Sequence, residues 1–252
     1  MAFQGGVLII GSLLWDEDNG RTQWRAQRLN KNNAKAVAVP IRYGRFSTNR
    51  NAYTMVFSRL CYRHSKLGQG VVVPFARSIG TFDDLRHEAE YLATAEGLNG
   101  NWEWGAVGLL KKAPSKLPGD FLEQWTGYFR ERSIRYQAFA GQTASEAPAI
   151  SREGLLDLSW PLDGEDSVEY DFILATPTRP RIQNNSNLKR YPRPREIATL
   201  VPSDNTHYFI NNVLHGVRTS EDTSIWKAIT KLHPEFAAEW PQVSSLLGEQ
   251  TR

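Results

Sequence analysis

The stretch VLIIGSLLW, residues 7–15, joins a short apolar run to a turn that contains a glycine. Residues 7–10 are aliphatic and rich in β-branched side chains, and they stop at Gly11, which predicts a buried strand that ends in a turn. A glycine at this place lets the backbone approach a ligand, and successive N–H groups in a turn can bind a carboxylate or an oxyanion. An ordinary turn is the alternative explanation of the same pattern.

The turn lacks the features of several well-known ligand-binding loops. The letters GSLLW contain none of the later glycines of the G-x-G-x-x-G fingerprint, and no lysine follows as a Walker motif requires. Ser12 is not part of a G-x-S-x-G elbow, so the sequence does not support a serine hydrolase. A dinucleotide site and a serine nucleophile are therefore not expected here.

A second informative stretch, residues 83–97, is predicted to form a helix. Two aspartates open it at the positive end of its dipole, and Gly97 stands where a C-terminal glycine would end it. An apolar stripe that includes Leu85 forms the expected buried face. At about 100° per residue, Glu96 returns to within about 20° of Leu85. Glu96 is thus predicted to be the one acid of this helix that faces the interior.

The position of Glu96 predicts a carboxyl group with a raised pKa. Glu90 falls on the opposite side of the helix, and Glu88 lies at the margin of the apolar stripe. Burial and the negative end of the helix dipole both disfavour an ionised Glu96. A carboxylic acid whose pKa is near neutral can both accept and return a proton. The alternative is that the helix frays at Ala95 and Glu96 reaches water.

The rest of the chain predicts an α+β fold. Strands interleave with helices but without regular βαβ spacing, which favours a compact α+β or closed-sheet domain. No shift in composition marks a boundary, so we expect a single domain over residues 1–252, with insertions near 100–164 and 177–192. Further strands are expected near residues 34–40, 53–58, 70–75, 106–112 and 168–175, a loop at 59–68, and helices near residues 120–134, 195–200, 204–215, 220–232 and 234–247.

Composition is ordinary for a globular protein, with 40% hydrophobic and 23% charged residues. The apolar run at residues 7–10 is too short for a signal-peptide core or a membrane span, so a cytoplasmic location without membrane contact is expected. The single cysteine, Cys61, excludes an intramolecular disulfide and a cysteine-based zinc cluster. The five histidines show no metal-ligand spacing, so no metal site is expected.

Charge does not indicate a nucleic-acid partner, because the formal net charge is only +3. Residues 179–195 are the local exception, since they carry six arginines and lysines and no acid. A solvated loop and a phosphate-binding loop are the two interpretations of this stretch. No motif of aromatic side chains that could stack on nucleobases accompanies these arginines and lysines, so binding of nucleic acid is not expected.

Taken in order along the chain, several blocks resemble the gamma-glutamylcyclotransferase-like family. The strand followed by GSLLW is similar to the tyrosine-glycine-serine loop of these enzymes. The blocks YTMVFS and GQGVVVPFA resemble their two central strands, and IGTFDDLRHEAEYLATAEGL resembles their short helix that ends in an acid–glycine pair. YPRPREIATLVPSDNTHYFINNV and GVRTSEDTSIWKAI resemble the segments that complete the sheet and add the terminal helices.

The resemblance implies a partly closed, mixed β-barrel with surrounding helices and a role in glutathione metabolism. It implies a cofactor-independent enzyme, in which the α-amine of a small γ-glutamyl substrate attacks its own γ-carbonyl and releases 5-oxoproline and an amine or amino acid. Glu96 corresponds to the catalytic acid of the family, here a general acid and base. The residues that would bind the substrate are Ile10, Gly11, Ser12, Leu13 and Leu14.

The chain also departs from the family pattern. Ile10 stands where the family has a tyrosine, which removes a hydroxyl group, and residues 100–164 are longer than a minimal member needs. These departures favour the alternative hypothesis of a non-catalytic protein that binds a small molecule or a partner on the same fold. Arg42 and Arg45 are candidates for steering an anionic substrate, with a surface position as the alternative for each.

Overall fold

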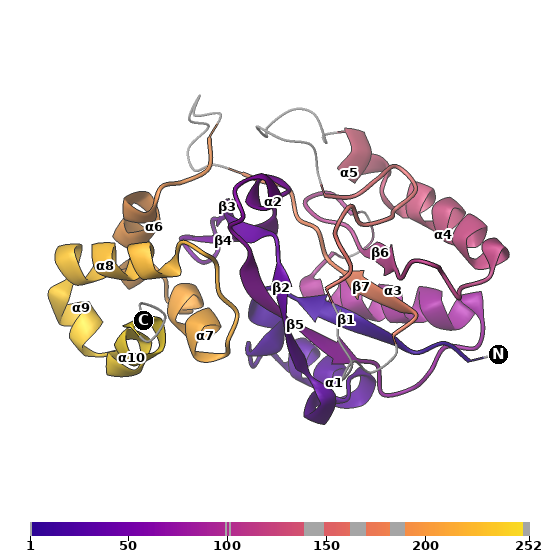
Figure 1. Ribbon diagram of the computed structural model, residues 1–252, viewed down its shortest axis with the longest axis horizontal. Coiled ribbons are helices and arrows are strands. Elements are labelled where there is room, and N and C mark those ends of the chain that lie inside the picture. The colour runs from indigo at the N-terminus through magenta and orange to yellow at the C-terminus, as the bar shows by residue number, and fades with distance from the viewer. Residues whose placement is uncertain are drawn as a thin grey trace.

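The centre of the computed structural model is a five-stranded mixed sheet with the strand order β2-β5-β1-β7-β6 (Figure 1). The structure describes residues 2–98, 100, 102–138, 149–161, 170–181 and 190–248. β1 pairs with β5 in the antiparallel direction and with β7 in the parallel direction. The five strands are β1 (Gly5–Ile9), β2 (Lys35–Val39), β5 (Gly68–Pro74), β6 (Gly108–Lys111) and β7 (Phe172–Ala175).

The parallel pair β1–β7 determines where the functional residues meet. Leu8 lies opposite Ala175 in this pair, so the chain leaves both strands at the same edge of the sheet. Gly11 follows β1 at this edge, and Thr176 follows β7. In open α/β sheets, ligands bind in the crevice outside the carboxyl ends of the parallel strands.

A separate hairpin is formed by β3 (Ile41–Ser47) and β4 (Ala52–Phe57). Its register shifts between Tyr43 and Arg45, so Gly44 forms a bulge. The bulge puts one extra residue between the two arginines of β3 and keeps Tyr43 in the core. In the described part of the chain the seven strands form this hairpin and an open five-stranded sheet, and no closed barrel is observed.

Helices of the N-terminal part pack beside the sheet, where α1 and α4 both contact α3. α3 begins with a capping box between Thr81 and Asp84 and ends at Gly97, whose φ of 78° is left-handed and therefore suits glycine. The helices of this part are α1 (Asn19–Arg28), α2 (Leu60–Arg63), α3 (Phe82–Glu96), α4 (Gly119–Arg132) and α5 (Ile134–Ala138). Two short 3-10 turns, η1 (Ser12–Leu14) and η2 (Lys31–Asn33), lie between β1 and β2.

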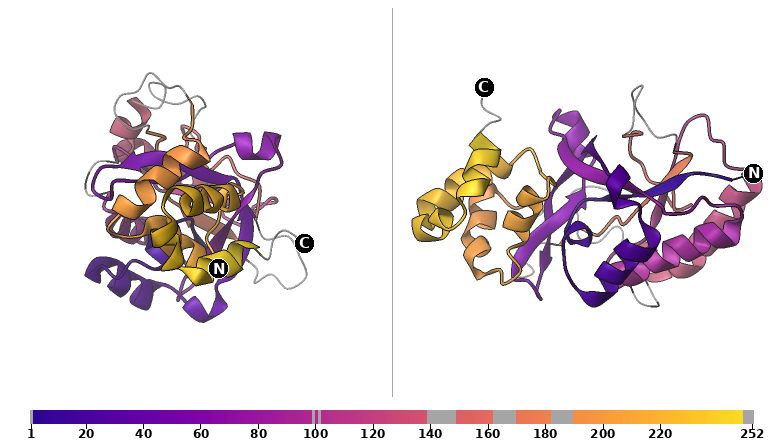
Figure 2. Two further views of the ribbon diagram at one scale, coloured as in Figure 1. Left: turned by 90° about the vertical axis from the view of Figure 1, so that its left-hand side faces the viewer. Right: turned by 90° about the horizontal axis from the view of Figure 1, so that it is seen from below.

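The C-terminal helices gather at one end of the molecule, beside the β3–β4 hairpin, as Figures 1 and 2 show from three directions. They reach the central site because α6 contacts β4 and α7 contacts η1. The elements of this group are α6 (Pro194–Leu200), η4 (Val201–Ser203), α7 (Tyr208–Leu214), α8 (Asp222–Leu232), α9 (Pro234–Ala238) and α10 (Pro241–Gly248).

The structure confirms the mixed α+β architecture and most of the predicted elements. The predicted strands correspond to β1, β2, β4, β5, β6 and β7, while α1 and β3 were not predicted. The expected loop at 59–68 contains the short helix α2, and the helix expected at 234–247 is divided into α9 and α10. The region 100–164 contains β6, α4 and α5, whereas most of 177–192 lies outside the described residues. No described helix has the length and apolar character that crossing a membrane requires.

Candidate functional site

A cavity of about 540 Å³ lies at the carboxyl edge of β1 and β7. The predicted loop contributes Ile10, Gly11 and Ser12 to its wall, and the end of α3 contributes Glu96. Leu13 and Leu14 do not line this cavity; Leu13 points into the core and is 3% exposed. The structure therefore brings Glu96 into the same cavity as the first part of the loop.

The loop itself is a tight turn held by its own backbone. The Gly11 carbonyl accepts the N–H of Leu14 at 3.1 Å, and the Ser12 carbonyl accepts the N–H of Asp16 at 2.8 Å. Gly11 is extended, so its backbone conformation does not require glycine. Space requires it instead, because a Cβ atom at Gly11 would lie 2.5 Å from the hydroxyl oxygen of Tyr208.

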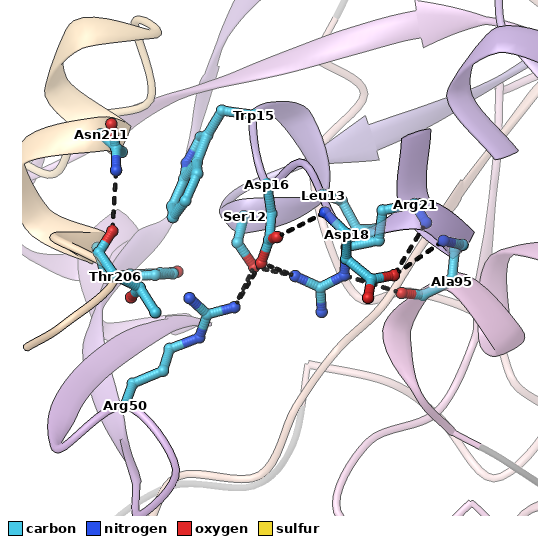
Figure 3. A network of polar contacts seen from close by, with 12 residues as sticks. Ser12, Leu13, Trp15, Asp16, Asp18, Arg21, Arg50, Ala95, Thr206 and Asn211 are labelled. Carbon is cyan, nitrogen blue, oxygen red and sulfur yellow. Dashed lines mark hydrogen bonds and ion pairs between the residues drawn. The ribbon is translucent and has the colours of Figure 1, made fainter. Parts of the chain in front are cut away.

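Two arginines from different parts of the chain contact Ser12, as Figure 3 shows. Arg21 Nη1 donates to Ser12 Oγ at 2.9 Å, and Arg50 Nη2 donates to the same oxygen at 3.3 Å. Both guanidinium groups also pair with Asp16 Oδ2, at 2.6 Å and 2.8 Å. Burial alone would raise the pKa of Asp16, but the hydrogen bond from Arg50 and the two arginine charges bring that pKa below its ordinary value. Asp16 thus stays ionised and neutralises part of the arginine charge.

Arg21 also connects the loop to the helix that carries Glu96. Its Nε donates to the carbonyl of Ala95 at 3.1 Å. This carbonyl belongs to the last turn of α3, where helix carbonyls lack partners and the dipole favours a cation. One side chain of α1 therefore fixes the loop after β1 against the end of α3.

Glu96 is half-buried, and its pKa is raised. Burial is the largest cause, and the nearby charges of Arg21, Arg45 and Arg50 oppose it without reversing it. The direction agrees with the prediction from the helix alone. The three arginines that moderate the shift come from α1 and from the β3–β4 hairpin, and none of them was predicted as a neighbour of Glu96.

One part of the prediction for α3 was wrong, because Glu96 is not the one inward acid of this helix. Glu88 is 4% exposed and therefore more buried than Glu96. It forms an ion pair with Arg28, whose Nε donates to Glu88 Oε2 at 3.2 Å. Arg28 belongs to α1, a helix that the sequence pattern did not reveal. The burial of Glu88 was missed because its ion-pair partner comes from this helix.

Tyr208 is a further cavity residue that sequence reasoning missed. It comes from α7 and is 4% exposed, and its hydroxyl accepts the N–H of Met55 at 3.3 Å. Burial raises the pKa of Tyr208, so the phenol stays protonated. Ile10 lacks a hydroxyl, but the fold supplies one beside Gly11 from a distant helix. No local signal in the sequence indicates this placement.

The two candidate arginines of β3 differ in position. Arg45 lines the cavity, and its guanidinium lies 4.4 Å from the ring centroid of Trp104. Arg42 lies outside this cavity, where it pairs with Glu221 at 3.6 Å and lies over the ring of Tyr191 at 4.1 Å. Of the two, only Arg45 faces the candidate site.

The basic stretch 179–195 is neither a uniformly solvated loop nor a single phosphate-binding surface in its described part. Arg181 lines the cavity, Arg179 donates to the carbonyl of Arg135 at 2.7 Å, and Arg190 pairs with Glu196 at 2.6 Å. Lys189 lies outside the described residues. The described part of the stretch therefore contributes one cation, Arg181, to the site.

The described residues contain no group of three or more His, Cys, Asp or Glu side chains that could hold a metal ion. Cys61 is buried, and its Sγ lies 3.6 Å from the carbonyl oxygen of Ile41. No protein-family model, curated protein or solved structure matches this chain. The chemistry of the site is therefore inferred from its own residues.

Proposed function

We propose that the protein is a gamma-glutamylcyclotransferase-type enzyme that converts a small γ-glutamyl compound into 5-oxoproline and an amine or amino acid. The observation that supports this most is the shared cavity, in which Glu96, a half-buried acid with a raised pKa, faces the loop that begins at Gly11. The proposal includes a partly closed barrel as the finer description of the α+β fold, a cytoplasmic location and a role in glutathione metabolism.

The reaction requires one group that moves protons. The α-amine of the substrate attacks the γ-carbonyl carbon, and a C–N bond forms that closes a five-membered ring. Glu96 as carboxylate takes the proton that the attacking amine loses, and as carboxylic acid it returns this proton to the leaving nitrogen. The old C–N bond then breaks, and Glu96 is a carboxylate again. A raised pKa suits the return of the proton, because the protonated form of Glu96 is then easier to reach than that of an exposed glutamate.

The loop and the arginines around it would hold the substrate in the reactive conformation. Leu14 donates its N–H to Gly11, whereas the N–H groups of Ser12 and Leu13 have no hydrogen-bond acceptor among the described residues. Of these two residues Ser12 lines the cavity, and its N–H would bind the α-carboxylate or the oxyanion that develops on the γ-carbonyl. Holding the two ends of one molecule together contributes much of the rate in an intramolecular reaction.

A non-catalytic binding protein on the same fold is the second candidate. It is favoured by the crowding of the loop, since Ser12 Oγ already accepts hydrogen bonds from both Arg21 and Arg50. The hydroxyl of Tyr208 also fills the space beside Gly11. In this case the cavity would bind an anionic small molecule, and Glu96 would contribute to recognition without moving protons.

Release of 5-oxoproline from a panel of γ-glutamyl amines, amino acids and peptides tests the proposal. Glu96→Gln keeps the shape of the side chain and removes the proton-transfer group, so kcat should fall by about 100-fold or more. Glu90→Gln is the matched control, because Glu90 lies on the same helix but pairs with Arg132 at the half-exposed surface. Circular dichroism should show both variants folded.

The two candidates predict different results in this assay. A Glu96→Gln variant that releases 5-oxoproline at the wild-type rate would contradict the assignment of Glu96. A wild-type protein that binds γ-glutamyl compounds in calorimetry and converts none of them would instead favour the binding protein.

A further inference from the structure

We propose that Arg45, Arg181, Thr176 and Thr178 form a second anion-binding subsite in the cavity, which binds a terminal carboxylate or phosphoryl group of the ligand. All four residues line the cavity, on the side formed by β3 and by the chain after β7. The subsite adds a ligand-binding detail to the proposed function. It rests on that function in one respect only, namely that the bound anionic ligand is a substrate. Its anion binding is measurable without turnover.

The first argument is the balance of charge in the cavity. Four arginines and a single acid, Glu96, are present among the described residues that line it. Arg21 and Arg50 share the carboxylate of Asp16, which stands behind the loop. In the described part of the chain, neither Arg45 nor Arg181 forms an ion pair with a carboxylate. The subsite therefore carries positive charge that a bound anion would neutralise.

The second argument is the fixed position of the two arginines. Arg181 donates its N–H to the carbonyl of Gly44 at 2.9 Å, and its own carbonyl accepts the N–H of Phe46 at 2.6 Å. These bonds place Arg181 beside Arg45 on the neighbouring segment. Trp104 supports the Arg45 guanidinium from one side, at 4.4 Å. Burial and the charge of Arg181 lower the pKa of Arg45 and outweigh the opposing charge of Glu96, as expected for two cations held close together.

The third argument is a pair of buried hydroxyl groups. Thr176 is 6% exposed, and its Oγ1 has no hydrogen-bond partner in the part of the chain that the structure describes. The Oγ1 atom of Thr178 is likewise buried and unpartnered there. Buried hydroxyl groups are normally hydrogen-bonded, so these two are explained by a ligand oxygen that accepts from them.

The topology makes this subsite a neighbour of the loop at Gly11. Thr176 directly follows β7, and the loop follows β1, its parallel partner. A ligand that reaches both places would carry an anionic group at each end. For a γ-glutamyl substrate, the loop would bind the α-carboxylate, and the subsite would bind a carboxylate or phosphoryl group on the part that leaves.

Calorimetric titration of the full chain with inorganic phosphate and with succinate, at constant ionic strength, tests the subsite. Arg45→Gln and Thr178→Val should each weaken binding, the first by about tenfold or more, as expected for a lost charge-assisted hydrogen bond. Arg42→Gln is the matched control, since Arg42 lies on the same strand and pairs with Glu221 outside the cavity. Arg181→Gln repeats the test at an exposed side chain.

The outcomes separate this subsite from the proposed reaction. Tighter binding of phosphate supports a phosphoryl ligand, and tighter binding of succinate supports a carboxylate ligand. Glu96→Gln should not weaken either titration, because it removes a negative charge, even though it should stop 5-oxoproline release. The subsite is disproved if neither anion binds, or if Arg45→Gln and Arg181→Gln both bind as the wild type does.

Discussion

Arg21 donates a hydrogen bond of 2.9 Å from its Nη1 to the hydroxyl oxygen of Ser12. The same guanidinium reaches the carbonyl of Ala95, so it joins the loop after β1 to the end of α3. These two segments carry the proposed substrate-binding groups and Glu96. A side chain from a third element, α1, therefore helps to fix the relative position of the loop and the acid.

Replacing Arg21 by methionine should disturb the site more than the fold. The variant keeps most of the aliphatic stem but loses the hydrogen bonds to Ser12 and Ala95 and the pair with Asp16. We expect kcat/KM for 5-oxoproline release to fall at least tenfold and the free energy of unfolding to fall by about 1–3 kcal/mol. Urea denaturation and steady-state kinetics measure both quantities. Arg86→Met is the control, since Arg86 pairs with Asp83 at the surface; equal effects in the two variants would contradict the role of Arg21.

The contact between Gly11 and Tyr208 predicts a rescue experiment. In Gly11→Ala the new methyl group would lie 2.5 Å from the Tyr208 hydroxyl oxygen, so one of the two segments must shift. We expect the substitution to lower the free energy of unfolding by about 1–3 kcal/mol, the usual effect of overpacking. Tyr208→Phe removes the clashing oxygen, so Gly11→Ala should be less destabilising in that background. Urea denaturation of the two single variants and the double variant measures this coupling, and strict additivity would argue against the contact.

The pH dependence of activity should follow the ionisation of Glu96. The pKa of Glu96 is raised above the ordinary value. Activity should therefore decline on acidification at a higher pH than the one at which an exposed glutamate becomes protonated. Arg45 lowers this pKa, so Arg45→Gln should move the acidic limb of the pH–rate profile to higher pH. NMR titration of the Glu96 carboxyl carbon gives the pKa directly. Arg42→Gln should leave the titration unchanged, and a shift to lower pH in Arg45→Gln would contradict the electrostatic argument.

Asp222 makes stability depend on pH in a way that is separate from the site. It is 1% exposed and accepts the N–H of Thr219 at 3.1 Å, and burial raises its pKa to about 7. Between about pH 4 and about pH 7 the folded chain keeps a proton that the unfolded chain has lost, so stability falls as pH rises and levels off above that range. At about 1.4 kcal/mol per pKa unit, this loss is on the order of 1–4 kcal/mol.

The variant Asp222→Asn separates this contribution from all other titrations. It cannot ionise, so the part of the decline that belongs to Asp222 should be absent. Free energies of unfolding from urea titrations of both proteins, compared across the same pH range, give the difference curve. A difference that stays constant with pH would show that Asp222 is ionised alike in the folded and unfolded chains.

Some of the candidate site was predictable because its signals are local. The apolar run before Gly11 predicted β1, and Gly97 predicted the end of α3, where its left-handed φ is observed. The raised pKa of Glu96 followed from its position on the helix. Such features depend on residues a few positions apart, so a single segment contains the information needed to predict them.

Other parts were missed because they depend on contacts between distant segments. The sequence of α1, NGRTQWRAQR, is too polar to show an apolar stripe, yet the helix packs on α3 and buries Trp24 and Arg25. Arg25 donates to the carbonyl of Leu13, and Arg28 pairs with Glu88. The hydrogen-bond and ion-pair partners of these arginines lie on other elements. The periodicity of the α1 sequence does not reveal such partners.

The sequence by itself determined the strand before Gly11, the helix that ends at Glu96, and the α+β class. Residues that are close together along the chain are sufficient to show the period of a strand or helix and the caps at its ends. Only the tertiary structure decided that these two segments face one cavity. The parallel pairing of β1 with β7 brings Gly11 and Thr176 to the same edge, across a long separation in sequence. Arginines from α1 and from the β3–β4 hairpin then lie near Glu96, and electrostatic interactions of this kind depend on distance in space and not on order along the chain.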